Sequence, residues 1–381
     1  AYIPAGLIGF FLGFDPHLIS LISWIAYLGT LGLLIKVLPA STNPWILLIW
    51  AFSQVYLLHF LTKVYPDALL VFWTVLIPVA ASYRHSRPFL AAFSMVAGFF
   101  FGFLTKETII FLALLPILLF AWDRKTKNRN LPFYLSLLGV GFGFAVLYLG
   151  YFWITFGSPF YRFESIQDGH YISEFTYADK SAWVMFKRLT ILPIVTFIER
   201  SFWIWLVFAS PGLVKIWKKP SSPGIEFGLS LVSLLVLFWF MSTNFRFYNP
   251  LYLNPRHLII LVPIMAFLIA LGWDEWKDNP SLKKVMAGLI VFGIGISLTQ
   301  QDWKMAGFQL AFLPLLLLRQ IPFRNLGFAV ILLLPALASL FYQHRIKGYS
   351  SFIQSLTQEI KNTEYQSCLL YTSPSPRDRQ K

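Results

Sequence analysis

The chain has 381 residues, of which 57% are hydrophobic and 13% are charged, and its formal net charge is +14. A soluble domain carries about 25% charged residues, so the composition excludes an ordinary soluble protein. Apolar runs of about 15 to 25 residues recur from end to end and indicate a polytopic helical membrane protein. Nucleic-acid binding is not expected, because the basic residues lie in short loops between these runs rather than on one face.

The chain begins with an apolar segment, residues 2–13, that is too short to cross a membrane and fits an interfacial helix. After it we predict about twelve transmembrane helices, so the expected fold class is an all-α polytopic membrane protein. The predicted spans are 17–37, 44–61, 66–83, 88–105, 108–122, 131–156, 195–217, 225–241, 256–273, 282–299, 305–318 and 326–342. The segment 108–122 is short, so a tilted, a broken and a half-buried helix are all open alternatives.

Alternate loops differ in charge, and this difference predicts the orientation of the chain. One set is short and strongly basic, as in the loop with Arg124, Lys125 and Lys127, and such loops face the cytoplasm. The other set is mixed in sign and includes one long loop, 157–190, without clear periodicity, which is more often functional than a mere linker. We therefore expect a multi-pass protein of the inner (plasma) membrane with its active site on the non-cytoplasmic side.

We assign residues 1–345 to one integral membrane domain and residues 346–367 to a short external tail. The last stretch, 368–381, resembles translated sequencing-adapter read-through and is left out of the fold prediction. It contains the only cysteine of the chain, so neither disulfides nor thiol chemistry are expected.

Charged residues at the outer ends of predicted spans form the candidate site, because such groups are costly to desolvate at a membrane boundary. Asp67 follows Pro66 and begins a span. It fits an ordinary helix start or an outward-facing carboxylate that binds a sugar hydroxyl, a cation or a metal. Lys106 and Glu107 lie between two spans, where the alternatives are a snorkelling lysine and phosphate recognition.

Arg256 and His257 begin a later span, at the end where basic residues are unusual. They fit either a snorkelled anchor or a clamp for phosphate or pyrophosphate. Arg246 and Tyr248 lie in the loop before them and are candidate members of the same substrate-binding site.

Two further patterns carry weaker signals. His170 and Tyr171 in the long loop are candidate contacts for an acceptor, although a loop histidine is also typical of a solvated side chain. The run Gly139-Val-Gly141-Phe-Gly143 superficially resembles a dinucleotide-binding loop, but no strand precedes it and it lies within a predicted span. Close helix packing at small residues is the better interpretation.

Four segments together resemble one known group of enzymes. They are Tyr65-Pro66-Asp67-Ala68, the Gly98–Lys106 run (GFFFGFLTK), Pro255-Arg256-His257-Leu258 followed by Pro263, and Gly157-Ser158-Pro159-Phe160-Tyr161. The chain resembles the GT-C superfamily of membrane glycosyltransferases, in the branch with protein O-mannosyltransferases and the lipid A aminoarabinose transferase. The resemblance extends over residues 1–345.

The resemblance implies inverting transfer of a sugar from a polyprenyl-phosphate carrier to a protein, lipid or glycan acceptor. It places Asp67 at the family's second outer acidic position and Lys106 and Arg256 at positions that line the donor site. The family's catalytic carboxylate lies in its first outer loop, which we expect upstream of Ala1, so no residue here is predicted to be the catalytic base. No cofactor is firmly implied, and a divalent cation at Asp67 is the alternative.

Two other functions stay open on the sequence. A lipid-linked oligosaccharide flippase usually has internal repeats and charges at mid-bilayer, and an O-antigen ligase or polymerase also has a long outer loop. Ionisable residues at the outer boundary favour the transferase. If Asp67, Lys106 and Arg256 serve one reaction, their side chains must converge on one outward-facing cavity that opens towards lipid and lies under the 157–190 loop.

The charge alternation predicts that residue 127 is cytoplasmic and residue 170 is external. Single cysteines, Lys127→Cys and His170→Cys, would be labelled with an impermeant maleimide in a Cys368→Ser background. In intact cells we expect labelling at position 170 only, with position 127 reacting after permeabilisation. Equal labelling of both positions from one side would contradict the predicted topology.

Overall fold

A computed structural model describes residues 2–13, 16–61, 65–128, 130–168, 177, 180–242, 248–318, 323–345 and 349–362. Within these ranges every regular element is a helix, and the sole β-type pairing is an isolated antiparallel bridge between Ser242 and Pro250. The chain divides into two compact units, residues 1–333 and 334–381. We describe each unit by itself.

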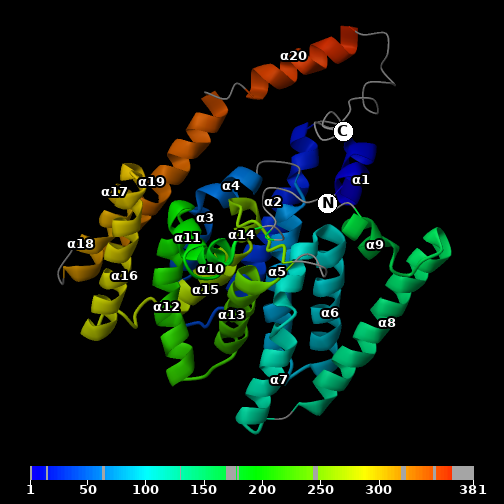
Figure 1. The fold of residues 1–381 in the computed structure, drawn as a ribbon, viewed down its shortest axis with the longest axis horizontal. Coiled ribbons are helices and arrows are strands. Elements are labelled where there is room, and N and C mark those ends of the chain that lie inside the picture. Colours follow the sequence, from blue (N-terminus) through cyan, green and yellow to red (C-terminus); the bar gives the residue numbers. More distant parts are fainter. Residues whose placement is uncertain are drawn as a thin grey trace. The chain divides into compact units, whose positions relative to one another are not determined.

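The first unit is a bundle of helices (Figure 1). Its helices are α1 (Tyr2–Leu12), α2 (Pro16–Val37), α3 (Pro44–Phe52), α4 (Val55–Leu61), α5 (Asp67–Ser82), α6 (Pro88–Thr105), the 3-10 helix η1 (Glu107–Leu112), α7 (Leu115–Lys125), α8 (Leu131–Phe156), α9 (Tyr161–Asp168), α10 (Ala182–Thr190), α11 (Leu192–Glu199), α12 (Phe202–Lys218), α13 (Gly224–Phe240), α14 (Pro255–Leu258), α15 (Leu261–Gly272), α16 (Pro280–Thr299), α17 (Trp303–Leu310), α18 (Phe312–Leu317) and the start of α19 (Arg324–Arg345).

Membrane-spanning character is clearest in five of the described helices, which are long and apolar enough to cross a bilayer. The number rises to seven if each of two bent pairs is one span: α3 with α4, bent by 75°, and α11 with α12, bent by 103°. Shorter apolar helices are α5, α13, α15 and the α17–α18 segment. The described chain is therefore all-α with five to seven candidate membrane spans.

The 108–122 segment is broken, which is one of the three alternatives that its length left open. Its first part is the 3-10 helix η1 and its second part is α7, which has a proline in its first turn. A proline there lacks only a backbone N–H that would have no helical partner anyway. The apolar segment at the start of the chain also forms a helix, α1, as predicted; its interfacial position stays a prediction.

Aromatic side chains form a large part of the buried core. Trp50 on α3 and Trp205 on α12 meet edge to face with ring centroids 5.3 Å apart, and the Trp205 indole N–H donates to the Trp50 carbonyl at 3.0 Å. Phe208 and Phe312 also pack against Trp50. Aromatic side chains of this size dominate core burial, so this cluster fixes α3, α12 and α18 together.

Helices α12 and α15 cross in direct backbone contact at glycines. A Cβ added to Gly212 would lie 2.1 Å from the Leu268 carbonyl oxygen, and one added to Gly272 would lie 2.2 Å from the Gly212 nitrogen. The glycine run of α8 behaves differently, because a Cβ at Gly139, Gly141 or Gly143 would meet nothing within 4 Å. The prediction that this run serves close helix packing within the chain is wrong.

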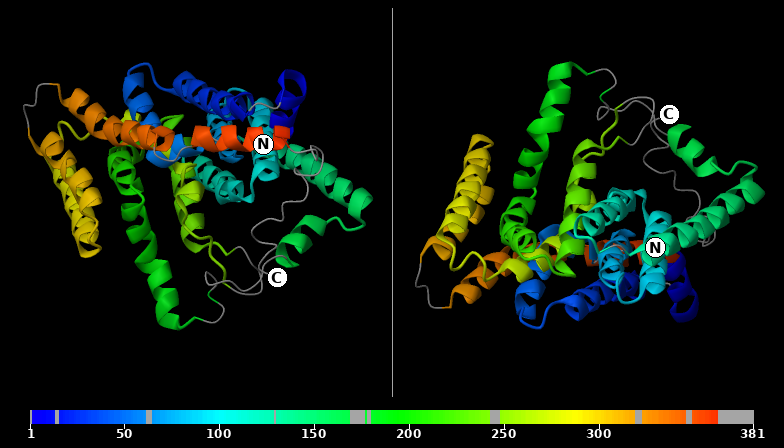
Figure 2. Two further views of the ribbon diagram at one scale, coloured as in Figure 1. Left: turned by 90° about the horizontal axis from the view of Figure 1, so that it is seen from above. Right: turned by 90° about the horizontal axis from the view of Figure 1, so that it is seen from below.

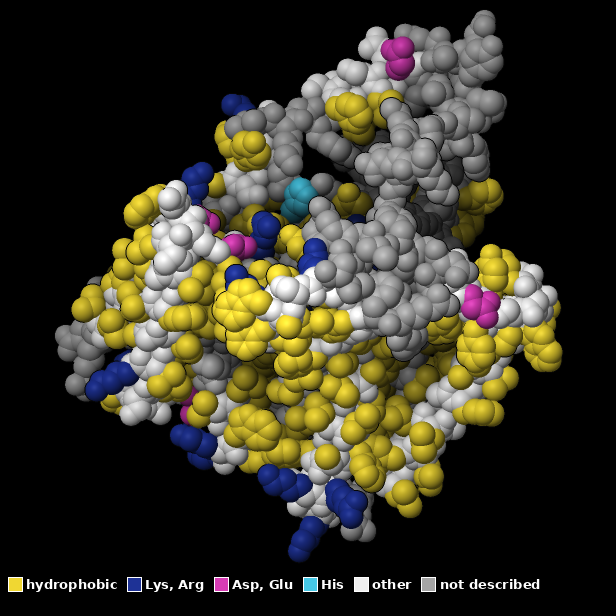
Figure 3. All heavy atoms as spheres, viewed as in Figure 1, with side chains coloured by type: hydrophobic (Ala, Val, Ile, Leu, Met, Phe, Trp, Pro, Cys, Tyr) yellow, Lys and Arg dark blue, Asp and Glu magenta, His cyan; other side chains and the backbone are white. Residues whose placement is uncertain are grey.

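Helix α8 packs against α6 at the edge of the bundle (Figures 1 and 2). It is apolar, yet Phe133 is its only buried residue, and Leu138 and Phe142 are each 72% exposed and Ile154 88% exposed. On the face in Figure 3, hydrophobic side chains form a broad belt with Lys and Arg side chains along its lower edge. An apolar surface between charged ends is what a bilayer requires of a protein that crosses it.

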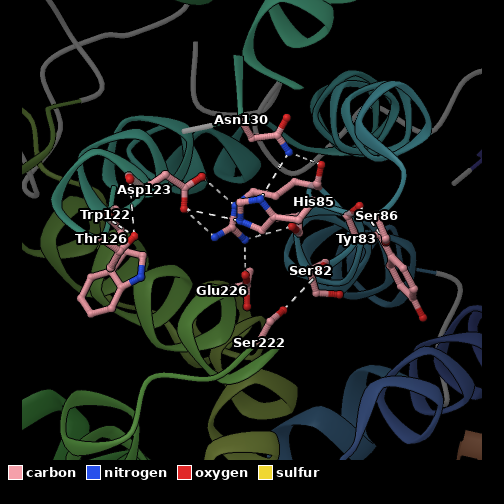
Figure 4. A network of polar contacts seen from close by, with 12 residues as sticks. Ser82, Tyr83, His85, Ser86, Trp122, Asp123, Thr126, Asn130, Ser222 and Glu226 are labelled. Carbon is pink, nitrogen blue, oxygen red and sulfur yellow. Dashed lines mark hydrogen bonds and ion pairs between the residues drawn. The ribbon is translucent and has the colours of Figure 1, made fainter. Parts of the chain in front are cut away.

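A buried ion network lies at the C-terminal end of α5 and links it to neighbouring helices (Figure 4). Arg84 donates to both oxygens of Asp123 on α7, at 2.9 and 2.7 Å, and to Glu226 in the first turn of α13. Tyr134 on α8 donates to Asp123 at 2.7 Å, and the Asn130 side chain donates to the Arg84 carbonyl. We call this group the Arg84 network; it fixes one end of α5, α7, α8 and α13.

The second unit is helical where it is described, with the C-terminal part of α19 followed by α20 (Tyr349–Asn362). Helix α20 is amphipathic and its apolar side chains Phe352 and Leu356 are 61% and 44% exposed. The sequence placed an external tail at 346–367, and within its described residues this tail is a helix.

Arg84→Ala should destabilise the protein strongly, because Arg84, Asp123 and Glu226 are 4%, 2% and 0% exposed and the change leaves two carboxylates buried without their cation. We expect a loss of about 3–5 kcal/mol in the free energy of unfolding, measured by SDS titration in mixed micelles. Arg87→Ala removes an exposed arginine from the same turn and is the matched control. Equal stability of the two variants would contradict the role given to Arg84.

Candidate anion-binding site

Asp67 is the centre of a second ion network at the opposite end of α5. Its carboxylate is 0% exposed and accepts from Lys106 Nζ at 2.9 Å through Oδ1 and from Arg256 Nε at 2.8 Å through Oδ2. Asp67 is the first residue of α5 and Pro66 precedes it. An acidic side chain in the first turn is favoured by the positive end of the helix dipole, so the local sequence explains why the carboxylate lies there.

Lys106 lies at the C-terminal end of α6, the helix that forms a hairpin with α5. It follows the last residue of α6, and its backbone N–H still donates to the Gly102 carbonyl at 2.8 Å. Its backbone is extended, so the chain leaves the helix at this residue. Helices α5 and α6 pack antiparallel. Asp67 at the start of α5 and Lys106 just after the end of α6 therefore lie at the same end of the helix pair.

Arg256 reaches the site from α14. The Asn254 side chain accepts from the Arg256 backbone N–H at 3.0 Å, which caps the helix, and Pro255 occupies its first position. The guanidinium lies 4.5 Å from the centroid of the Tyr65 ring and 6.0 Å from that of Phe60. These rings hold the guanidinium by cation–π contact.

The site has two cations for one carboxylate, so its formal charge is positive. Lys106 has three N–H donors and Arg256 has five, and one donor of each goes to Asp67. Within the described residues, no other protein acceptor engages the ammonium of Lys106 or the terminal nitrogens of Arg256. Burial lowers the pKa of Lys106, and the charge of Asp67 opposes that shift. The arrangement suits a bound anion with several oxygen acceptors.

His257 and Glu107 flank this site. His257 Nδ1 lies 3.0 Å from the Tyr252 carbonyl; a carbonyl only accepts, so this contact places the proton on Nδ1. Glu107 is not part of the Asp67 ion network; its carboxylate accepts a hydrogen bond from Arg162 of α9. The Arg162 guanidinium also lies 4.8 Å from the Phe103 ring centroid. Glu107 therefore fastens the beginning of the long loop beside the site.

Tyr248 packs against Tyr177, with ring centroids 5.9 Å apart, and the charge of Arg188 acts on its hydroxyl. Among the described residues it makes no hydrogen bond, ion pair or ring contact with Asp67, Lys106 or Arg256. Its predicted membership in the Arg256 site stays a prediction, as does substrate binding by each of the other residues. The candidates Arg246, His170 and Tyr171 lie outside the described residues.

The predicted convergence of Asp67, Lys106 and Arg256 is confirmed, since Lys106 and Arg256 both donate a hydrogen bond to the Asp67 carboxylate. The Asp67 side chain is fully buried and so does not face solvent; its position on the outer side of the membrane stays a prediction. Both of its oxygens already hold cations, and the described part of the chain contains no group of three or more potential metal ligands. A cavity that opens to lipid and a roof formed by 157–190 stay predictions.

Several residues that make ion pairs or buried polar contacts were not predicted from the sequence. Arg162, Asp123, Glu226 and Arg188 were not singled out, although Asp123 is an acid beside a strongly basic loop and Glu226 is an acid at the start of an apolar helix. An isolated acid in either context is a usable signal for a buried ion pair. Arg162 and Arg188 lie in the long loop, where no periodicity distinguished them from solvated residues.

Comparison with models of protein families, with curated proteins and with solved structures finds no match to this chain.

Asp67→Asn keeps the shape of the side chain but removes the charge that two cations share. We expect the free energy of unfolding to fall by about 1.5–3 kcal/mol, the usual worth of hydrogen bonds to a charged group, measured by SDS titration. Asp274→Asn is the control, since Asp274 is 78% exposed and pairs only with Lys277 in the described contacts. A surface change of this kind stays within about 0.5 kcal/mol. An unchanged Asp67→Asn protein would mean that the carboxylate does not hold the site together.

Proposed function

We propose that this protein is a membrane glycosyltransferase of the GT-C type that transfers a sugar from a polyprenyl-phosphate carrier to a protein, lipid or glycan acceptor. One observation carries the proposal: Asp67, Lys106 and Arg256, from three of the segments that resemble this superfamily, form one ion network with an excess positive charge. A phosphate group of a lipid carrier is the anion that best suits such a site in a membrane protein.

The chemistry follows from the charges. When a sugar leaves its carrier, negative charge grows on the carrier phosphate, and fixed cations stabilise that charge without reorganising. Lys106 and Arg256 would supply these cations. Asp67 would orient both of them and keep Lys106 protonated, because its charge raises the lysine pKa against the effect of burial. Deprotonation of the acceptor hydroxyl needs another base, which we do not assign in this chain.

We also propose about twelve membrane-spanning segments in a multi-pass inner-membrane protein. A helix or a helix pair coincides with each predicted span. The shorter ones, such as α15, are largely buried and would cross the bilayer inside the bundle. Helix α5 has 16 residues, or a length of about 24 Å, and carries an ion network at each end. The Asp67 end would be non-cytoplasmic and the Arg84 end cytoplasmic.

Placement of the candidate site at helix ends favours a transferase over a flippase, which would hold charged groups near the middle of the bilayer. Asp67 begins its helix, Lys106 follows the end of another, and Arg256 lies in the first turn of a third.

Binding of undecaprenyl phosphate to the purified protein in nanodiscs tests the proposal. Lys106→Ala and Arg256→Ala should each weaken binding by roughly 30- to 160-fold, which corresponds to a lost charged hydrogen bond of about 2–3 kcal/mol. Lys277→Ala, which removes a lysine paired with exposed Asp274, should bind as the unaltered protein does. Undecaprenol, which has no phosphate, should bind poorly. Equal binding of the alcohol and the phosphate would refute a phosphate site here.

A further inference from the structure

We propose that Arg188, Tyr177 and Tyr248 form a second anion-binding site that takes a phosphate or similar oxyanion group. The three residues come from different parts of the chain: Arg188 from α10, Tyr177 from the long loop before it, and Tyr248 from the segment between α13 and α14. The inference does not depend on glycosyl transfer, because it concerns only what these side chains would bind.

Arg188 is a buried cation without an anionic partner in the described part of the chain. Its side chain is 3% exposed and donates to three backbone carbonyls, those of Phe238, Trp239 and Leu251, at 3.4, 3.3 and 3.3 Å. These distances exceed the usual 2.9–3.0 Å of an N–H···O bond. No described carboxylate lies within ion-pair distance of it. A guanidinium stays protonated in proteins, so its charge has to be balanced by other means.

The carbonyls that Arg188 contacts offer only part of that balance. Phe238 and Trp239 belong to the last turn of α13, whose C-terminal end carries roughly half a negative elementary charge. A cation at a helix C-terminus is a common stabilising arrangement. Burial lowers the pKa of Arg188 and the nearby tyrosines only partly oppose this, which agrees with an incompletely compensated charge.

The Tyr248 hydroxyl is the independent observation that points to a ligand. It is buried and has no hydrogen-bond partner, whereas buried hydroxyls are nearly always paired. Its ring lies 5.9 Å from that of Tyr177, and the Tyr177 backbone N–H donates to the Tyr248 carbonyl at 3.2 Å. Arg188 contacts the same segment, because its guanidinium donates at 3.3 Å to the carbonyl of Leu251, three residues after Tyr248. Burial raises the pKa of both tyrosines, and the charge of Arg188 opposes that rise.

The Arg188 guanidinium and the Tyr248 hydroxyl together offer hydrogen-bond donors but have no negatively charged acceptor among the described residues. An arginine that only capped α13 would explain its own three contacts but would leave the Tyr248 hydroxyl without a partner. An oxyanion would accept from the guanidinium and from the phenol at once. Phosphate can reach such a site as the free ion or as a lipid headgroup, and an acidic residue of the undescribed part of the loop, Glu174 or Asp179, is the internal alternative.

The test is thermal unfolding of the full chain in phosphatidylcholine nanodiscs, titrated with inorganic phosphate at constant ionic strength. The unaltered protein should show a saturable rise in Tm. Tyr248→Phe removes only an unpaired hydroxyl, so the variant should fold normally. Its affinity for phosphate should fall about tenfold, as expected for the loss of one hydrogen bond to a charged group. Arg188→Gln should remove the part of the rise that persists in Arg256→Gln, a variant in which the Asp67 site has lost one of its two cations. Tyr151→Phe changes a tyrosine that is 59% exposed on α8 and should titrate as the unaltered protein does.

A second arm separates the two sources of phosphate. In nanodiscs with phosphatidylglycerol and no added phosphate, a lipid headgroup at the site would raise Tm in the unaltered protein and less in Tyr248→Phe. Identical behaviour of these two proteins in both arms would overturn the proposal. So would phosphate protection that is lost in Arg256→Gln and kept in Arg188→Gln, because the anion would then occupy the Asp67 site. Phosphate binding that arises only in Glu174→Gln or Asp179→Asn would also overturn it, since an internal carboxylate would fill the site.

Discussion

The buried carboxylate of Asp67 is the constraint on which the arrangement of the bundle depends. A charged group with no exposure to water needs nearby opposite charge to stay ionised. The cations come from Lys106 and Arg256, which are 39 and 189 positions away in the sequence. The first turn of α5, the end of α6 and the first turn of α14 must therefore meet. One residue thus fixes three helix ends and leaves a surplus of one positive charge among them.

The other end of α5 repeats this arrangement with the signs reversed. There a single cation, Arg84, lies between Asp123 and Glu226, so two carboxylates share one guanidinium. The dipole of α5 favours both choices, because its N-terminus attracts the Asp67 carboxylate and its C-terminus attracts Arg84. Within the networks themselves, the Asp67 group has one excess positive charge and the Arg84 group one excess negative charge, although basic residues such as Arg87, Arg124 and Lys125 lie close to Arg84 in the sequence.

How much of this could be read from the sequence depends on whether the signal is local. Apolar runs and the charges that interrupt them are local, so the helices and the candidate residues Asp67, Lys106 and Arg256 were predictable. Ion pairs such as Arg84 with Glu226, which are 142 positions apart, depend on which helices become neighbours. The prediction of close packing at the glycine run of α8 was wrong for the same reason. Small residues permit close packing, but the sequence does not show whether a partner helix lies beside them within the chain.

Asp67 already binds two cations, Lys106 and Arg256, and this limits the chemistry that its carboxylate could perform. A general base needs a free lone pair within reach of the proton it removes and a pKa near the working pH. Each oxygen of Asp67 already accepts from a cation, and Glu107, the next carboxylate along the chain, accepts from Arg162. The Asp67 site therefore offers hydrogen-bond donors rather than a free base, and in the proposed transfer reaction the proton acceptor would have to be a group other than Asp67 or Glu107.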